Sequence, residues 1–92
     1  MKIIKFSATW CNPCKVFDPI FDKVVSKFPN LEIEKCDVEN NPELTEEYKI
    51  LALPTIVILS DDNKLLLKVP GMIDENKLHE HITQTINSNI NK

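Results

Sequence analysis

The order of elements in the first 38 residues places the strongest limit on the fold. Residues Lys2–Ser7 are rich in β-branched and aromatic side chains, as expected for a short strand. From Asn12 to Phe28 the apolar residues are spaced by one, three and four positions, which predicts an amphipathic helix. Leu31–Val38 then alternates like a second strand. A strand, a crossover helix and a second strand imply parallel pairing with a right-handed connection.

The remaining sequence predicts a short helix, two antiparallel strands and a last helix. The short helix covers Asn41–Tyr48, and the continuous apolar run Pro54–Leu59 indicates a strand covered on both faces. Leu65–Val69 returns after a turn, and Asp74 is placed to cap the last helix. The apolar stripe of that helix is Leu78, Ile82 and Ile86. The order βαβαββα predicts one α/β domain over residues 1–92, with a four-stranded mixed sheet and helices on both faces.

Composition and charge exclude several classes of function. The 92 residues suffice for a single core, and the net charge of -3 comes from interspersed acids and bases. No basic run is long enough to follow a phosphate backbone, so nucleic acid is not an expected ligand. The chain shows neither a signal peptide nor a membrane-spanning run, and we expect a cytoplasmic protein with no membrane partner. In that compartment a closely spaced cysteine pair is more often catalytic or metal-bound than a permanent disulfide.

Cys11 and Cys14 stand where the first strand gives way to the first helix, within the segment ATWCNPCK. Three positions apart on a helical turn, their side chains lie on one side, close enough for a disulfide. Cys11 is at the helix N-terminus, where unpaired N–H groups and the helix dipole favour a thiolate and lower the pKa of the thiol. Cys14, one turn further, is better shielded and is placed to attack whatever bonds to Cys11. The pattern therefore predicts a redox-active dithiol.

Other interpretations of the cysteines remain open at this point. A structural zinc site needs four ligands, but the chain has no second C-x-x-C, and His79 and His81 point to nearly opposite sides of the predicted helix. We therefore expect no metal. An inert pair of buried thiols is the plainest alternative, although the strand-to-helix junction is an exposed place for core residues. Cys36 is expected to be a small core residue of the second strand.

The segment WCNPC resembles the W-C-G-P-C active site of the thioredoxin family, with Asn12 in place of the usual glycine. The likeness continues in register over nearly the whole chain. Its further elements are Lys15, Pro19, the K-x-D-V-x-x-N-P pattern from Lys35 to Pro42, the LPT segment from Leu53 to Thr55, and Gly71 after the last strand. The resemblance implies a thioredoxin-like fold.

The resemblance also implies a thiol–disulfide oxidoreductase that reduces disulfides in proteins. The Cys11 thiolate would attack a substrate sulfur, and Cys14 would resolve the mixed disulfide, with no bound cofactor. The electron donor of the family is a reductase of the thioredoxin reductase type, which depends on a flavin and NADPH. The alternatives are a glutaredoxin-like protein reduced by glutathione and a redox-silent binding module of the same fold.

Four residues outside the cysteine pair are expected to contact the substrate. The resemblance implies a cis peptide bond before Pro54, and a turn there that offers the Leu53 backbone to an extended substrate segment. Trp10 and Gly71 would contribute to a shallow apolar rim around that turn. Core packing for Trp10 and a simple turn for Gly71 are the alternatives.

The sequence departs from the family pattern before its first strand. Family members normally begin with an extra strand and helix, which this sequence does not show. The second strand is therefore expected at an edge of the sheet, where Glu32, Glu34 and Lys35 would discourage association. We expect a monomer.

A second departure lies inside the first strand. Where the family carries a buried aspartate behind the second cysteine, this chain has Lys5, and Ser7 replaces a common aromatic residue. The resemblance also places Lys35 toward the cysteines, with ordinary surface exposure as the alternative. A cation here would favour the thiolates and tune their pKa values. The reduction potential is then expected to be less negative than the roughly -270 mV of a typical thioredoxin. The alternative is that Lys5 extends to solvent.

Overall fold

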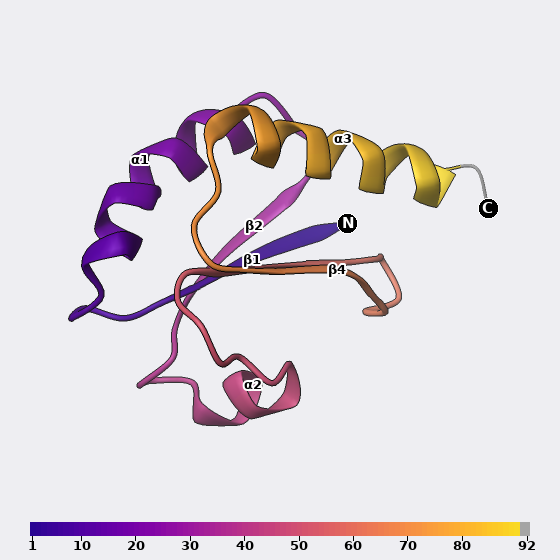
Figure 1. The fold of residues 1–92 in the computed structure, drawn as a ribbon. Helices are drawn as coiled ribbons and strands as arrows, with labels where there is room; N and C mark the ends of the chain where they lie inside the picture. The colour runs from indigo at the N-terminus through magenta and orange to yellow at the C-terminus, as the bar shows by residue number, and fades with distance from the viewer. Residues whose placement is uncertain (91–92) are drawn as a thin grey trace.

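A computed structural model describes residues 1–90 as a four-stranded sheet with helices on both faces (Figure 1). The elements are β1 (Lys2–Ser7), α1 (Asn12–Val25), β2 (Glu32–Asp37), α2 (Pro42–Glu47), β3 (Thr55–Leu59), β4 (Leu65–Pro70) and α3 (Glu75–Ile90). The strand order is β2-β1-β3-β4, with β1 parallel to β2 and the other pairs antiparallel. Helices α1 and α3 lie on one face and α2 on the other (Figure 1). The predicted order of elements and the mixed sheet are confirmed.

The side chains of β1 alternate between the two faces, so that each face has its own core. Ile3 points toward α1 and α3, whereas Ile4 and Phe6 point toward α2. The buried residues of the first core are Ile3, Phe17, Phe21, Val24, Val25, Leu31, Ile56, Ile58, Leu78 and Ile82. Those of the second core are Ile4, Phe6, Cys36, Val57 and Leu59. Lys5 shares the face of Ile3, which brings its side chain under α1.

All five residues of β3 are buried, as the run Pro54–Leu59 predicts for a strand covered on both faces. The expected cap of α3 is also present, since the Lys77 N–H donates a hydrogen bond to Asp74 Oδ1 at 2.7 Å. Cys36 is a buried free cysteine in β2, in agreement with its expected place in the core. Burial, followed by the charges of Glu34 and Asp37, raises the pKa of its thiol.

Helix α1 is shorter than the apolar spacing predicts. It ends at Val25 and not near Phe28. The N–H groups of Lys27 and Phe28 donate to carbonyls three residues back, both at 3.0 Å, so the chain tightens into turns. Pro29 follows, and a residue before proline disfavours the helical conformation. Phe28 still packs against the core, so its apolar spacing reports burial and not helix length.

Strand β2 lies at one edge of the sheet in the described residues, as the sequence predicts. Glu32 and Lys35 of this strand are exposed, and so is the apolar Ile33. Lys2 Nζ of the neighbouring strand lies 3.5 Å from Glu32 Oε2 and 3.2 Å from Glu34 Oε1. These ion pairs cover the sheet surface beside the edge with charge, which disfavours strand addition.

Replacement of Phe17 tests how much the buried face of α1 contributes to the stability of the fold. Phe17 is fully buried between the helix and the sheet, so Phe17→Ala should lower the free energy of unfolding by about 3–5 kcal/mol. Val16, its exposed neighbour on the same helix, provides the control, and Val16→Ala should change stability by less than about 0.5 kcal/mol. Urea unfolding followed by circular dichroism measures both. Equal losses for the two variants would contradict the assigned packing of α1.

Candidate active site

The turn between β1 and α1 places the two cysteines at the start of the helix. Cys11 is the N-cap residue, with extended backbone angles (φ -90°, ψ 104°), and its Sγ accepts a hydrogen bond from the Cys14 N–H at 3.2 Å. The Cys11 N–H donates to the Ala8 carbonyl at 3.1 Å, which fixes the approach to the helix. The sulfurs are bonded at 2.25 Å, with the Cα atoms 5.3 Å apart. The expected placement of the pair at a helix N-terminus is confirmed.

The helix end beside the pair is suited to negative charge. Pro13 occupies the first turn, where its missing N–H leaves no helical bond unmade, and the first turn carries no acidic side chain. The helix dipole therefore acts on Cys11 without a competing carboxylate in that turn. A thiolate on Cys11 is the charge that this end of the helix stabilises.

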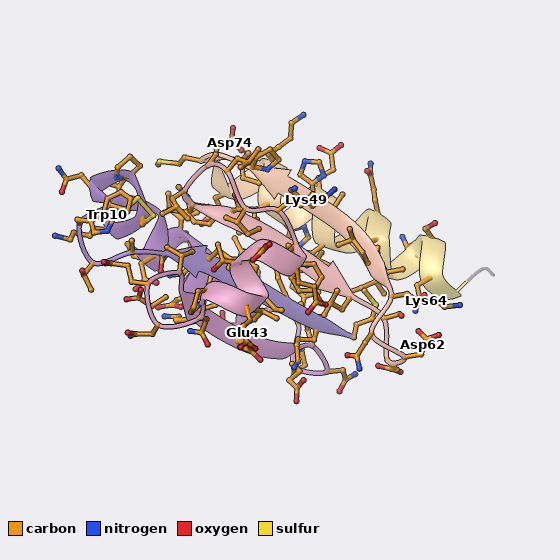
Figure 2. The ribbon with its side chains drawn as sticks, turned by 90° about the horizontal axis from the view of Figure 1, so that it is seen from below. Trp10, Glu43, Lys49, Asp62, Lys64 and Asp74 are labelled. Carbon is orange, nitrogen blue, oxygen red and sulfur yellow. A yellow bond between two sulfur atoms is a disulfide. The ribbon has the colours of Figure 1, made fainter. Side chains whose placement is uncertain are left out.

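The two cysteines are both buried, with 5% and 3% of their surfaces exposed, but they border different spaces. Cys11 lines an open groove of about 630 Å³. Cys14 lines a separate cavity of about 330 Å³, which is also open to solvent. Figure 2 shows the disulfide near Trp10, at one end of the molecule.

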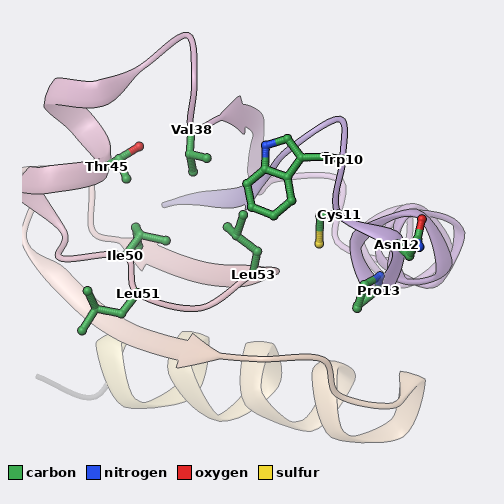
Figure 3. A pocket seen from close by; sticks show the side chains of 9 residues that line it. All are labelled: Trp10, Cys11, Asn12, Pro13, Val38, Thr45, Ile50, Leu51 and Leu53. Atoms are coloured by element: carbon green, nitrogen blue, oxygen red, sulfur yellow. The ribbon is translucent and has the colours of Figure 1, made fainter.

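The groove next to Cys11 is mostly apolar (Figure 3). It is lined by Trp10, Cys11, Asn12, Pro13, Val38, Thr45, Ile50, Leu51 and Leu53. The Trp10 indole is exposed and stands on the Cys11 side, while Ile50 and Leu51 form the far side (Figure 3). Leu51 is 96% exposed, so the groove offers apolar surface to a partner and not to the core of the chain.

Of the predicted contact residues, Trp10 and Leu53 line the groove with Cys11. Pro54 is fully buried directly behind Leu53, and the Leu53–Pro54 peptide bond is cis, as the resemblance implies. Gly71 does not line the groove. Its N–H donates to the Pro54 carbonyl at 2.8 Å, and its φ of +84° is a conformation that favours glycine. Gly71 therefore braces the turn behind the groove.

The sequence did not predict the far wall of the groove, which comes from the residue after β2, from α2 and from the loop after α2. Its residues are Val38, Thr45, Ile50 and Leu51. Lys68 of β4 holds this wall, because its Nζ donates to the carbonyls of Tyr48 at 3.0 Å and Lys49 at 2.9 Å. The pair of apolar residues Ile50 and Leu51, close before the LPT segment, was the available signal.

The cavity beside Cys14 contains the two lysines predicted to tune the thiols, and it also contains a carboxylate. Lys5 is only 3% exposed and does not extend to solvent; its ammonium pairs with the carboxylate of Asp18 and lies 5.3 Å from the centre of the Phe21 ring. Lys35 Nζ lies 3.2 Å from Asp18 Oδ1 and 2.9 Å from Asp22 Oδ1. Burial and then the Lys35 charge lower the pKa of Lys5, and Asp22 opposes that shift.

Among residues 1–90, no three His, Cys, Asp or Glu side chains are grouped so that they would hold a metal ion. The helices of the described region include none with the length and apolar character to cross a membrane.

Comparison with known proteins agrees with the geometry of this site. The thioredoxin family model matches residues 1–84. Mitochondrial thioredoxin-3 of Saccharomyces cerevisiae is 39% identical over 69 residues, covering 75% of this chain and 54% of the yeast protein. Thioredoxin of Mycoplasmoides gallisepticum is 36% identical over 78 residues, covering 85% of this chain and 77% of its own. The chain thus spans only about half the length of the yeast relative.

Solved structures show the same relation. The oxidised form of the yeast mitochondrial thioredoxin 3 superposes with a TM-score of 0.80 and 34% identity, over 90% of this chain and 76% of the other. Thioredoxin 1 of Thermosipho africanus, at 24% identity, shares the fold over the full length of both chains with a TM-score of 0.82. The family match, the relatives and the bonded cysteines at the head of α1 lead to one conclusion: the chain belongs to the thioredoxin family.

Proposed function

We propose that this chain is a dithiol–disulfide oxidoreductase that reduces disulfides in proteins. The observation that carries the proposal is the bonded Cys11–Cys14 pair at the N-terminus of α1, open to an apolar groove on the Cys11 side. The electrons are carried by the two sulfurs themselves, so the reaction needs no bound cofactor. Family members act on protein disulfides, which agrees with this chemistry.

The reaction follows from the position of each thiol. In the reduced protein the Cys11 thiolate attacks one sulfur of a substrate disulfide, and the other substrate sulfur leaves with the electron pair. Cys14 then attacks Cys11, the bond between Cys11 and the substrate breaks, and the second substrate sulfur leaves as a thiolate. The protein is left with the Cys11–Cys14 disulfide. Two electrons have passed to the substrate.

The groove supports a substrate that binds as an extended segment. Leu53 and Trp10 flank Cys11, and the wall of Ile50 and Leu51 continues the apolar surface away from the sulfur. A polypeptide with its disulfide at Cys11 would lie along this surface, with the Leu53 backbone as a partner for strand-like hydrogen bonds. Pro54 and Gly71 act behind the groove, by holding the shape of that turn.

We also make proposals about the electron donor, the compartment and the oligomeric state of this chain. Members of the family are reduced by a thioredoxin reductase, and we propose such a donor for this chain. Redox titration against glutathione and against a thioredoxin reductase distinguishes this donor from a glutaredoxin-like route. We also propose that the chain is cytoplasmic and monomeric; the ion pairs on the sheet surface beside the β2 edge support a monomer. Cell fractionation and sedimentation at micromolar concentration test these two statements.

The roles of the cysteines predict different results for their variants. Cys11→Ser should slow the reduction of insulin by dithiothreitol more than about a hundredfold, because the attacking sulfur is lost. Cys14→Ser should accumulate a mixed disulfide with the substrate, visible by mass spectrometry, because nothing resolves it. Cys36→Ala is the matched control, since that thiol is buried and does not line the groove, and it should leave the rate unchanged.

Wild-type activity in Cys11→Ser would refute the proposed reaction. Full biological function in a variant with both Cys11 and Cys14 changed to serine would instead support the redox-silent binding module of the same fold.

Replacement of Lys5 should shift the reduction potential of the Cys11–Cys14 pair in a defined direction. Removal of a buried cation near the thiols raises their pKa values and destabilises the reduced form, so Lys5→Met should make the potential more negative. The expected shift is on the order of 30 mV, the equivalent of about 1.4 kcal/mol for two electrons. Asp18 offsets part of the Lys5 charge. That the reduction potential of this chain is less negative than the roughly -270 mV of a typical thioredoxin therefore stays a prediction.

The control for this measurement is Lys64→Met, which changes the net charge equally. Lys64 lies in the turn between β3 and β4, at the opposite end of the molecule from Trp10 (Figure 2). Its potential should match that of the wild type, because exposed charges at that range are screened by salt. Equal shifts in the two variants, or none in Lys5→Met, would show that Lys5 does not tune the thiols.

A further inference from the structure

The resolving step requires Cys14 to lose a proton, and Cys14 has little direct access to water. Only 3% of its surface is exposed, and it does not line the groove where Cys11 meets the substrate. It lines the second cavity, which at about 330 Å³ is large enough to hold water. A thiolate is the nucleophile in disulfide exchange, so the proton must leave through this space.

The charged groups facing that cavity come from three elements. Lys5 is on β1, Lys35 is on β2, and Lys15 and Asp18 are on α1. Asp18 is the one carboxylate among the lining residues in the described part of the chain. An ammonium group has no lone pair with which to accept a proton, whereas a carboxylate accepts on its oxygens, so Asp18 is the acceptor in the cavity.

The position of Asp18 relative to Cys14 suits proton transfer through water. The two residues are four positions apart on α1, which puts them one turn apart on the same side of the helix. Neighbours of this kind have Cβ atoms about 5–6 Å apart, a separation that a single water can bridge. The Asp18 side chain is also 43% exposed, so a proton that it receives can pass on to solvent.

Two lysines hold the carboxylate in this place. Lys5 reaches Asp18 from beneath α1, and Lys35 reaches the same oxygen, Oδ1, from the edge strand. A buried ammonium is stable only when it is paired, so the burial of Lys5 in turn fixes Asp18. Asp22 also binds Lys35, at 2.9 Å, but it does not line the cavity.

We propose that Asp18 is the proton acceptor for Cys14, through water in this cavity, and that Lys5 and Lys35 are the positioning residues that hold it. The inference rests on the proposed reductase function. In the mixed disulfide, the Cys14 S–H gives its proton to the water, which gives one of its own to the Asp18 carboxylate. The Cys14 sulfur forms a bond to Cys11 Sγ, the bond between Cys11 and the substrate breaks, and the substrate thiolate takes a proton from solvent. When the disulfide is reduced again, Asp18 returns a proton to Cys14.

Stopped-flow reaction of the reduced protein with DTNB separates the two steps. Attack by Cys11 releases one thionitrobenzoate in a phase that depends on concentration, and attack by Cys14 releases the second in a phase that does not. Cys36→Ala is the background for all variants, so that only the two site thiols react. Asp18→Asn should slow the second phase about a hundredfold at neutral pH, the lower end of general base catalysis, and leave the first phase unchanged. Asp22→Asn is the comparison on the same helix; it removes a partner of Lys35 but not the carboxylate that lines the cavity, so it should slow the second phase far less than Asp18→Asn.

The pH profile separates proton transfer from a structural effect. In Asp18→Asn the deficit should narrow as pH rises, because hydroxide can then take the proton from Cys14 directly. Asp18→Glu, which keeps the carboxylate, should recover most of the rate. A second phase as fast as that of the wild type at every pH would overturn the proposal. A deficit of the same size at every pH, or equal deficits in Asp18→Asn and Asp22→Asn, would also overturn it.

The double variant with Lys5→Met and Asp18→Asn tests whether the second phase slows because the Lys5 ammonium has lost its partner and not because the proton acceptor is gone. Asp18→Asn alone leaves the Lys5 ammonium buried without this partner, which can disturb the fold or the thiols. The double variant removes both charges and should remain as slow as Asp18→Asn; recovery of the wild-type rate would overturn the role of Asp18. If the proposed reductase function were wrong, the result would be different. The first phase would be absent, or Cys14→Ser would still release the second thionitrobenzoate.

Discussion

The packing of α1 against the sheet is the interaction on which the site depends. Phe17 and Phe21 are fully buried on this helix, and they set its height and rotation over β1 and β3. Because the helix begins at the end of β1, the same packing holds Cys11 at the N-cap and Cys14 one turn inside. The dithiol is therefore supported by the largest core of the molecule, although it lies at one end (Figure 2). Rigid support of this kind keeps two reacting sulfurs in register.

The helix also divides the surroundings of the two sulfurs, and this division agrees with the different tasks that we propose for them. On the Cys11 side the lining is apolar and open, which suits contact with a polypeptide. On the Cys14 side the lining carries Lys5, Lys35 and Asp18, which suits the movement of protons. A single disulfide thus connects a surface for recognition with a small charged cavity. Each half of the proposed exchange reaction thus has its own surroundings.

Lys5 illustrates how a buried charge is tolerated in a chain of this size. A lone ammonium under α1 would be costly, and burial does lower the pKa of Lys5. The carboxylate of Asp18 and the face of the Phe21 ring provide partners for it. Lys35 shares Asp18 and adds Asp22, so two cations and two anions form a connected group between β1, β2 and α1. Such a group adds little stability by itself, but it specifies how the helix and the edge strand meet.

The sequence by itself determined the features that depend on local spacing. The order of the elements, the capping of α3 by Asp74 and the position of Cys11 and Cys14 at a helix start all follow from periodicity and from neighbours along the chain. The cis bond before Pro54 came only with the family resemblance. The length of α1 was overestimated, since burial of Phe28 imitates a helical position after the helix has ended.

Only the tertiary structure decided which distant residues meet. Lys5 and Asp18 are thirteen positions apart on a strand and a helix, and either one read in sequence is compatible with full exposure to solvent. Their contact has two causes. Side chains alternate along β1, so that Lys5 faces α1, and the rotation of α1 about its axis turns Asp18 toward Lys5. The groove wall at Ile50 and Leu51 likewise depends on how α2 docks. Long-range packing of this kind is set by the assembled sheet and cores, which local patterns do not encode.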